Sequence, residues 1–331
     1  MRTLFNLVFF LVLISSKSTA QVQPDKNLSE KDSIELENQL MKLLGMEDKS
    51  NSYFIASVGL GNRIYSAKNK ALNANNGKSS VVVYSPSISY FNKNGFGVSA
   101  GANLHKDLKD FGFNQYSLSP SFDLKGNENI SLGVSFTHYF VKDKYSEFSS
   151  SVQNDLYTSF SYKKCWLQPG IALGYSLGAY GEAKNRDTLI GGIQRHFYDT
   201  SNFKTNTFYT MFSAGHQFFW YSVLNKSDGI SFRPSLVMNA GSGTVTTTHL
   251  TNVPPPGAGG DGVFKAVSRK RRPARIQTSN FQIQSIGLNL DLNYSIGNFK
   301  IEPQFYLDYY LHSTSTEKIT AIFMLNVGYT F

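Results

Sequence analysis

Polar side chains alternate with apolar ones on both sides of a tight turn near the end of the chain, at Gly297–Asn298. A two-residue turn fixes the register of the strands beside it, so Ile296 is expected to pair with Phe299. Carboxylates, amides and a lysine then lie opposite one another, which suits a constriction or a solute-binding wall; a satisfied internal polar network is the alternative. The predicted polar patch comprises the pairs Ser295–Lys300, Asn293–Glu302, Asp291–Gln304 and Asn289–Tyr306, with Asp308, Arg63 and Arg233.

Six basic residues are clustered in the segment FKAVSRKRRPAR, directly after the tract PPPGAGGDG. The Pro/Gly tract predicts a mobile, extended arm, and clustered Arg and Lys make charge-assisted contacts with anionic groups. The segment is therefore a candidate site for an anionic surface glycan or for lipid phosphates, with a plain solvated loop as the alternative. The basic residues are Lys265, Arg269, Lys270, Arg271, Arg272 and Arg275.

Histidine placement raises the question of a metal site or a hydrolase. Five of the six histidines, His105, His138, His196, His249 and His312, fall at one set of strand ends or in the adjoining loops. None of them forms a His-x-x-x-His pair, which is a common spacing of zinc ligands. The segments THYF and LHSTST also lack the His-x-Ser-Asn type of motif that an outer-membrane phospholipase needs. We therefore predict no metal, no cofactor and no catalytic residue.

The start of the chain predicts export. Arg2, the apolar run LFNLVFFLVLI and the small residues STA form a signal peptide over residues 1–20. Residues 21–52 form a polar leader, in which SEKD resembles a capping box that opens an amphipathic helix at Ser29. That helix is expected to plug the lumen of the β-barrel predicted below, to dock a periplasmic partner or to lie on the membrane surface. A loosely ordered lead-in to the barrel is the alternative. An exported chain is a poor nucleic-acid binder in spite of its net charge of +9.

From Tyr53 onward the hydrophobic period is two, with large apolar residues on one face and small polar residues on the other. Short turns alternate with long connections, as they do in outer-membrane barrels. An aromatic content of 14% fits such a barrel, and alternation explains a mean hydropathy of only −0.25. We therefore predict an all-β, transmembrane, antiparallel up-and-down barrel over residues 53–331, with both chain ends on the periplasmic side. Its twelve expected strands are 53–65, 81–91, 96–104, 116–124, 130–140, 154–162, 166–181, 205–220, 230–247, 281–296, 299–311 and 319–331.

Five prolines interrupt the predicted strands: Pro86, Pro120, Pro169, Pro234 and Pro303. Each has the parity of a lipid-facing residue and lies a few residues from a short turn. Proline removes one donor from the ladder and is normally confined to sheet edges or bulges. These positions are therefore expected to mark bulges near the rim of the barrel, where water can satisfy the freed carbonyl.

The strand pattern and the ending NVGYTF resemble those of outer membrane β-barrel proteins of Bacteroidota. The resemblance covers Tyr53 to Phe331 and includes the aromatic-x-aromatic ending formed by Tyr329 and Phe331. It implies that the last strand is read by the barrel-assembly machinery and that the protein contacts outer-membrane lipid. It implies a structural class and no particular activity.

Small inward residues suggest that the barrel is not filled. Gly, Ser and Ala dominate the inward face of the third, fifth and seventh expected strands, for example Gly101, Ser135 and Gly174. The resulting space is expected either to conduct solutes or to receive a plug. The first hypothesis is therefore a passive pore or solute-uptake channel. A non-conducting structural or interaction barrel and, less favoured, a lipid or peptide hydrolase at the rim are the alternatives.

Overall fold

The fold is known from a computed structural model, in which the described part of the chain consists of β-strands and connections. The expected signal peptide and almost all of the leader, with its helix, lie outside the described residues. Within the described part, no helix is long and apolar enough to cross a membrane. The described residues are 51–62, 82–106, 111–127, 129–141, 152–190, 193–225, 227–253, 268–271, 274–311 and 318–331.

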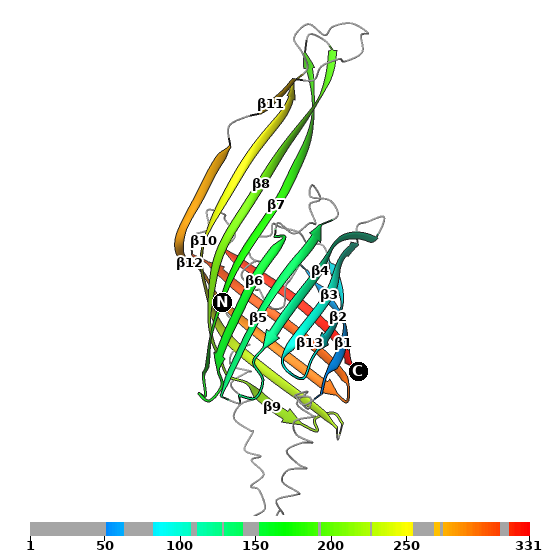
Figure 1. The fold of residues 1–331 in the computed structure, drawn as a ribbon, viewed down its shortest axis with the longest axis vertical. Helices are drawn as coiled ribbons and strands as arrows, with labels where there is room; N and C mark the ends of the chain where they lie inside the picture. The colour runs from blue at the N-terminus through cyan, green and yellow to red at the C-terminus, as the bar shows by residue number, and fades with distance from the viewer. Residues whose placement is uncertain are drawn as a thin grey trace, which may run out of the picture.

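The strands form one antiparallel sheet that is rolled up on itself (Figure 1). Their bounds are β1 Tyr53–Gly61, β2 Val83–Phe91, β3 Phe96–Lys106, β4 Phe111–Asp123, β5 Ile130–Val141, β6 Asn154–Tyr162, β7 Gln168–Ile190, β8 Ile193–Gly215, β9 Phe218–Tyr221, β10 Asp228–Val253, β11 Ser268–Arg271, β12 Arg275–Ile296, β13 Phe299–Tyr310 and β14 Ile319–Thr330.

Two sets of pairings close the barrel. The last strand, β14, pairs with β1, and the backbone N–H of Phe331 donates to the carbonyl of Phe54 at 2.9 Å. On the other side β8 pairs with β10, and β9 continues β8 along β10 in the same register. The ring therefore contains twelve strands, β1 to β8, β10, β12, β13 and β14, which confirms the predicted fold class. Closure removes the open edges that would otherwise expose backbone groups.

The outer face of the barrel is apolar. Exposed Val, Ile, Leu and Phe side chains occupy the positions that the period-two pattern assigns to the exterior, such as Val98, Val134, Leu156 and Phe323. The inward positions between them carry Ser, Gly, Thr and Tyr. A contiguous apolar band around a closed barrel is the arrangement that burial in a bilayer requires.

Aromatic side chains form a ring around the short-turn end of this exterior. Phe54 packs on Tyr90 with ring centroids 4.7 Å apart, and Phe96 packs on Phe122 at 5.0 Å. The chain terminus adds Phe299, Tyr329 and Phe331, whose successive centroids lie 5.1 and 4.7 Å apart. Trp166 at the same end is 71% exposed. Such aromatic girdles are typical of the boundary between a bilayer and water.

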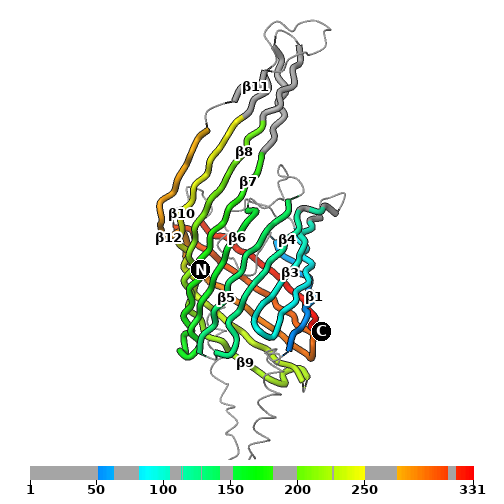
Figure 2. Tube along the Cα trace, viewed as in Figure 1, coloured from blue at the N-terminus to red at the C-terminus, as the bar shows by residue number. Residues whose placement is uncertain are grey.

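Four strands continue far beyond the barrel (Figures 1 and 2). β7, β8, β10 and β12 contain 23, 23, 26 and 22 residues, whereas β6 ends its pairing with β7 at Leu177 and β13 ends its pairing with β12 at Ser285. The segments 182–204 and 248–280 were expected to connect strands, but residues 182–190, 193–204, 248–253, 268–271 and 275–280 belong to strands themselves. We call this projecting sheet the strand extension; it comprises residues 178–190, 193–206, 243–253 and 275–284.

The five prolines lie on the expected parity but do not form bulges. Pro86 pairs with Val58 of β1 on one side. On the other side, the residue pairing between β2 and β3 stops at Tyr84 and resumes at Ser87 in the same register. The β4–β5 ladder at Pro120 and the β12–β13 ladder at Pro303 are interrupted in the same way. The register shifts that the barrel does have lie elsewhere, at Asn103/Leu104 and at Asn239–Gly243. Each proline thus leaves one ladder with a missing donor and needs no extra residue.

Asp228 anchors the connection from β9 to β10. Its carboxylate accepts hydrogen bonds from the backbone N–H groups of Val223, Leu224 and Asn225 at 2.8, 2.9 and 3.0 Å. The preceding Ser222 adopts a φ of 52°, a left-handed conformation that is unfavourable for a residue with a side chain. The carboxylate therefore holds together a strained turn.

We expect Asp228→Ala to lower the thermal unfolding temperature of the barrel, because three backbone donors lose their acceptor at once. Ser227→Ala is a matched control, since Ser227 is exposed in the same turn. Circular dichroism melting in detergent measures both variants. Equal unfolding temperatures for Asp228→Ala and the parent would contradict the anchoring role.

Candidate functional site: the barrel lumen

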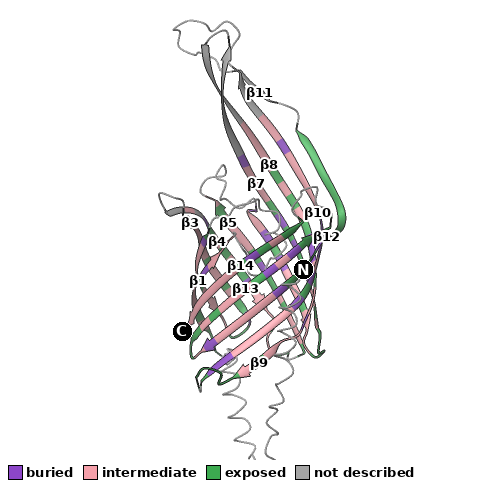
Figure 3. Ribbon diagram, turned by 180° about the vertical axis from the view of Figure 1, so that it is seen from behind, coloured by how far each residue is buried: buried purple, intermediate pink, exposed green. Residues whose placement is uncertain are grey.

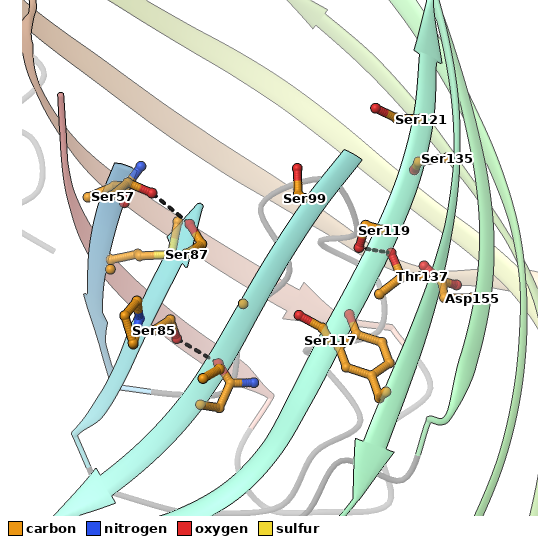
Figure 4. Close-up of a pocket in the computed structure, with 18 residues that line it drawn as sticks. Ser57, Ser85, Ser87, Ser99, Ser117, Ser119, Ser121, Ser135, Thr137 and Asp155 are labelled. Carbon is orange, nitrogen blue, oxygen red and sulfur yellow. Dashed lines mark hydrogen bonds between the residues drawn. The ribbon is translucent and has the colours of Figure 1, made fainter. Parts of the chain in front are cut away.

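One side of the lumen holds a cavity lined by hydroxyl groups. The cavity has a volume of about 240 Å³ and lies against the inner faces of β1 to β6 and β14. Figure 4 shows serine side chains of neighbouring strands facing the same space. The lining includes eight serines, Ser57, Ser85, Ser87, Ser99, Ser117, Ser119, Ser121 and Ser135, together with Thr137, Tyr139 and Asp155.

Cross-strand hydrogen bonds hold several of these hydroxyl groups in place. Ser57 Oγ lies 2.7 Å from Ser87 Oγ, and Ser119 Oγ lies 2.8 Å from Thr137 Oγ1 (Figure 4). Ser85 Oγ donates to Asn103 Oδ1 at 2.7 Å. A hydroxyl group both donates and accepts, so this wall interacts with water or a polar solute without requiring a charge.

Two clusters, each built around a buried tyrosine, Tyr209 or Tyr306, occupy the lumen along the remaining strands. Tyr209 of β8 is only 3% exposed, and its hydroxyl donates to Asp155 Oδ1 at 3.0 Å. Ser176 Oγ donates to the same oxygen at 2.7 Å, and Tyr157 and Ala172 pack around the ring. This cluster gives the buried Asp155 carboxyl hydrogen-bond partners from two strands, β7 and β8.

The second tyrosine cluster lies on β10, β12 and β13. Tyr306 is 2% exposed, and its hydroxyl accepts a hydrogen bond from Asn239 Nδ2 at 2.7 Å. The same amide group donates to Ser285 Oγ at 2.9 Å. Asp308 is fully buried two residues beyond Tyr306. These contacts join three neighbouring strands on the inner face of the barrel.

Both tyrosines lie over glycines, which corrects part of the prediction that small inward residues leave space. A Cβ atom added to Gly174 would overlap the phenol ring of Tyr209, and one added to Gly287 would lie 2.8 Å from Tyr306 Cε2. An aromatic ring that covers a glycine in a neighbouring strand protects exposed backbone and fixes register. The small residues of β7 are therefore packing sites, whereas Ser99, Gly101 and Ser135 do line the cavity.

The register predicted from the Gly297–Asn298 turn is confirmed. β12 and β13 pair Ser295 with Lys300, Asp291 with Gln304 and Asn289 with Tyr306. The remaining predicted pair, Asn293–Glu302, lies at the interruption beside Pro303, where the same register continues without a bridge.

The predicted polar patch is brought together in part. Arg233 of β10 lies directly opposite Asp291 of β12, and Asn289 Nδ2 donates to the Asp291 carboxylate. Glu302 Oε2 accepts from Asn326 Nδ2 at 3.0 Å. Buried amide oxygens of Asn293 and Gln304 have no hydrogen-bond partner within the described part of the chain. Arg63, the remaining member of the predicted patch, lies outside the described residues. The role of the polar patch as a constriction or a solute-binding wall stays a prediction.

The basic segment is placed only partly. Lys265 and Arg272 lie outside the described residues, whereas Arg269, Lys270 and Arg271 belong to β11, which pairs with β10. Arg275 begins β12 and is exposed. This part of the basic segment is therefore a strand, whereas the Pro/Gly tract lies outside the described residues. Binding of an anionic glycan or of lipid phosphates stays a prediction.

Two of the loop-side histidines have described hydrogen bonds. His138 Nδ1 lies 2.7 Å from Asn154 Oδ1, and His249 Nδ1 lies 2.8 Å from Ser201 Oγ. His216, at the opposite end, lies 2.7 Å from the carbonyl of Trp166 and stacks on its indole ring. Among the described residues, no three His, Cys, Asp or Glu side chains are grouped as metal ligands.

Sequence reasoning did not single out most of the cavity-lining serines. The signal that identifies them is present in YSPSIS and YSLSPSF, where serines recur at every second position opposite the apolar residues. Asp155 was also missed, because its importance depends on Tyr209, which lies 54 residues away in the sequence.

No protein-family model matches the chain, and no curated protein sequence matches it. Among solved structures, the chain is similar to a NanC porin, with 8% identity, a TM-score of 0.32, and coverage of 84% of this chain and 98% of the porin. It is also similar to a bacterial polysaccharide outer membrane secretin, with 8% identity, a TM-score of 0.33, and coverage of 86% and 99%. The outer membrane channel DcaP of Acinetobacter baumannii matches with 8% identity, a TM-score of 0.22, and coverage of 85% and 96%. At these values the likeness carries no functional argument.

Proposed function

We propose that this chain is an integral outer-membrane barrel that acts as a passive channel for small polar solutes. The observation that carries the proposal is the hydroxyl-lined cavity of about 240 Å³ inside a closed barrel. The apolar exterior and its girdle of aromatic side chains support residence in a bilayer. The signal peptide expected over residues 1–20 supports export to the outer membrane, with both chain ends in the periplasm.

The chemistry of the cavity favours neutral or weakly charged solutes. Asp155 is the only charged side chain among the described lining residues, and it is held by Tyr209 and Ser176. Serine hydroxyls exchange hydrogen bonds with water and with polar solutes at little energetic cost. Selection then depends on size and hydrogen bonding.

Planar-bilayer recording tests the proposal directly. We expect stepwise ion conductance from the purified chain that begins at Gln21, with weak preference between cations and anions. A second preparation without residues 21–50 tests whether the leader acts as a plug, since its removal would then raise the conductance. Absence of conductance from both preparations, in barrels shown to be folded, would refute the channel.

A non-conducting interaction barrel is the second candidate function. The observation that favours it is the strand extension, because a simple pore does not need four strands that continue beyond its rim. Folded barrels that do not conduct, but do retain a binding partner through residues 178–190, 193–206, 243–253 and 275–284, would support this alternative.

A further inference from the structure

The strand extension has two outer strands, β7 and β12, and neither has a described partner strand along its free edge. The edge of β12 is the less charged of the two, since residues 182–187 of β7 read EAKNRD. β12 pairs with β10 along its whole upper part, from Thr247–Arg275 to Gly243–Ser279, whereas its pairing with β13 begins only at Ser285. No described strand pairs with residues 275–282 on that side. Every one of these residues is exposed, as the green upper part of β12 shows (Figure 3). An open edge presents a row of backbone donors and acceptors to a further strand.

The sequence of this edge does little to prevent pairing. Natural edges are usually blocked by lysine, proline, bulges or inward-pointing charges. Residues 275–282 read RIQTSNFQ, with a single charged residue and no proline. The pairing of β12 with β10 is regular from Arg275 to Ser279, and the first register shift on β12 falls between Ser279 and Gln282. The part of the edge farthest from the barrel is therefore a regular template.

Positive charge lies at the distal end of the edge. Arg275 is exposed there, and β11, which contains Arg269, Lys270 and Arg271, continues along the same side of β10. Only one end of the template is basic, since residues 276–282 carry no charge. A complementary partner strand would thus be acidic at the end that meets Arg275.

We propose that residues 275–282 form a docking edge for an extended peptide segment of another protein, which adds to β12 as an antiparallel strand with its acidic carboxyl-terminal end opposite Arg275. Main-chain hydrogen bonds give affinity in this mode of recognition, and the side chains give specificity. The inference concerns the projecting sheet and does not depend on whether the lumen conducts.

A second copy of the chain is a poorer occupant. On the proposed membrane insertion, two copies in one bilayer project their extensions in the same direction. Their edges would therefore meet in parallel, with Arg275 beside the Arg275 of the other copy, and like charges directly opposite one another are destabilising. An acidic segment from another protein avoids both problems.

Synthetic peptides provide the test. The probe is an eight-residue, end-capped peptide of alternating Thr and Val with three Glu at its carboxyl-terminal end, labelled for fluorescence anisotropy with the detergent-solubilised mature chain. Two further peptides carry N-methyl groups on alternate residues, one on the odd and one on the even positions. We expect one methylated peptide to lose binding and the other to keep it, because only every second amide of an added strand faces β12.

Charge variants separate the edge from its surroundings. We expect Arg275→Glu to weaken binding of the probe at least about tenfold, which corresponds to ~1.4 kcal/mol. Lys204→Glu is the matched control, because Lys204 is exposed on the same extension but lies on the interior strand β8, between β7 and β10. We expect Lys204→Glu to leave the affinity unchanged.

Several results would overturn the proposal. They are failure of the probe to bind the folded parent chain, equal binding of both methylated peptides, and equal weakening by Lys204→Glu and Arg275→Glu. Binding of anionic lipopolysaccharide at low salt, without binding of the probe, would instead assign the basic end to glycan or lipid phosphate. A folded barrel in each variant is verified by circular dichroism.

Discussion

Gly174→Ala is expected to destabilise the barrel by about 3 kcal/mol, in the range of the larger single-site effects in folded proteins. The added methyl group would occupy the position of the Tyr209 phenol ring, which is almost fully buried and therefore has little room to move. Moving the ring removes one hydrogen bond from the buried Asp155 carboxyl, at a cost of ~1–3 kcal/mol. The ring also loses its packing against Tyr157 and Ala172.

Denaturant unfolding in detergent or lipid vesicles measures this effect, and Gly59→Ala is the matched control. Gly59 also faces the lumen, but the nearest atom to its added Cβ would be Ser85 Cβ at 3.5 Å, an ordinary contact distance. A double-mutant cycle with Tyr209→Ala isolates the ring, since Gly174→Ala should cost little once the ring is absent. An equal cost of Gly174→Ala with and without the ring would show that the glycine has another role.

The barrel itself was predictable because its exterior imposes a strict period of two. Every second residue from Ile319 to Phe331 is apolar, and Ile319, Phe323 and Phe331 are exposed on the outer face. The two-residue turn at Gly297–Asn298 then fixed a register that the structure confirms, as Ser295 and Lys300 illustrate. Binary pattern and turn chemistry agree here, which is why both strands and register follow from the sequence.

The strand extension was not predictable from the same signal. Beyond the barrel rim neither face of a strand belongs to the apolar outer surface. The alternation of apolar and polar residues therefore stops there, although the pairing between strands continues. GTVTTTHLT, residues 243–251, has β-branched residues on both faces, and its pairing with β8 runs unbroken to Thr251–Asp199. Threonine enrichment was the remaining signal, and it expresses strand propensity without a buried face.

The two tyrosine clusters of the lumen were missed for a different reason. Parity identifies which residues point inward, but it does not show how far a side chain reaches across the barrel. Gly174 and Ser99 both follow the pattern of small inward residues, yet Gly174 lies under Tyr209 and Ser99 borders the cavity. The difference comes from the neighbouring strand, since Gly174 pairs with Tyr209 and Ser99 pairs with Ser89 and Ser119.

Ser99 is consequently the position at which a large side chain should act on transport with the least effect on folding. Its cross-strand neighbours are serines, so an indole ring introduced there meets small side chains and extends into the cavity of about 240 Å³. Val98, the preceding residue, is 42% exposed on the apolar exterior. The two adjacent positions therefore offer the same substitution on opposite faces of one strand.

We expect Ser99→Trp to reduce the single-channel conductance by more than half, because the indole would occupy much of the cavity of about 240 Å³ through which solutes are proposed to pass. Val98→Trp should leave the conductance unchanged, since a tryptophan on the exterior belongs to the membrane-facing surface. Planar-bilayer recordings on both variants, each verified as folded, make the comparison. Equal conductance of Ser99→Trp and the parent would mean that solutes do not pass this cavity, and the channel proposal would then require another route through the barrel.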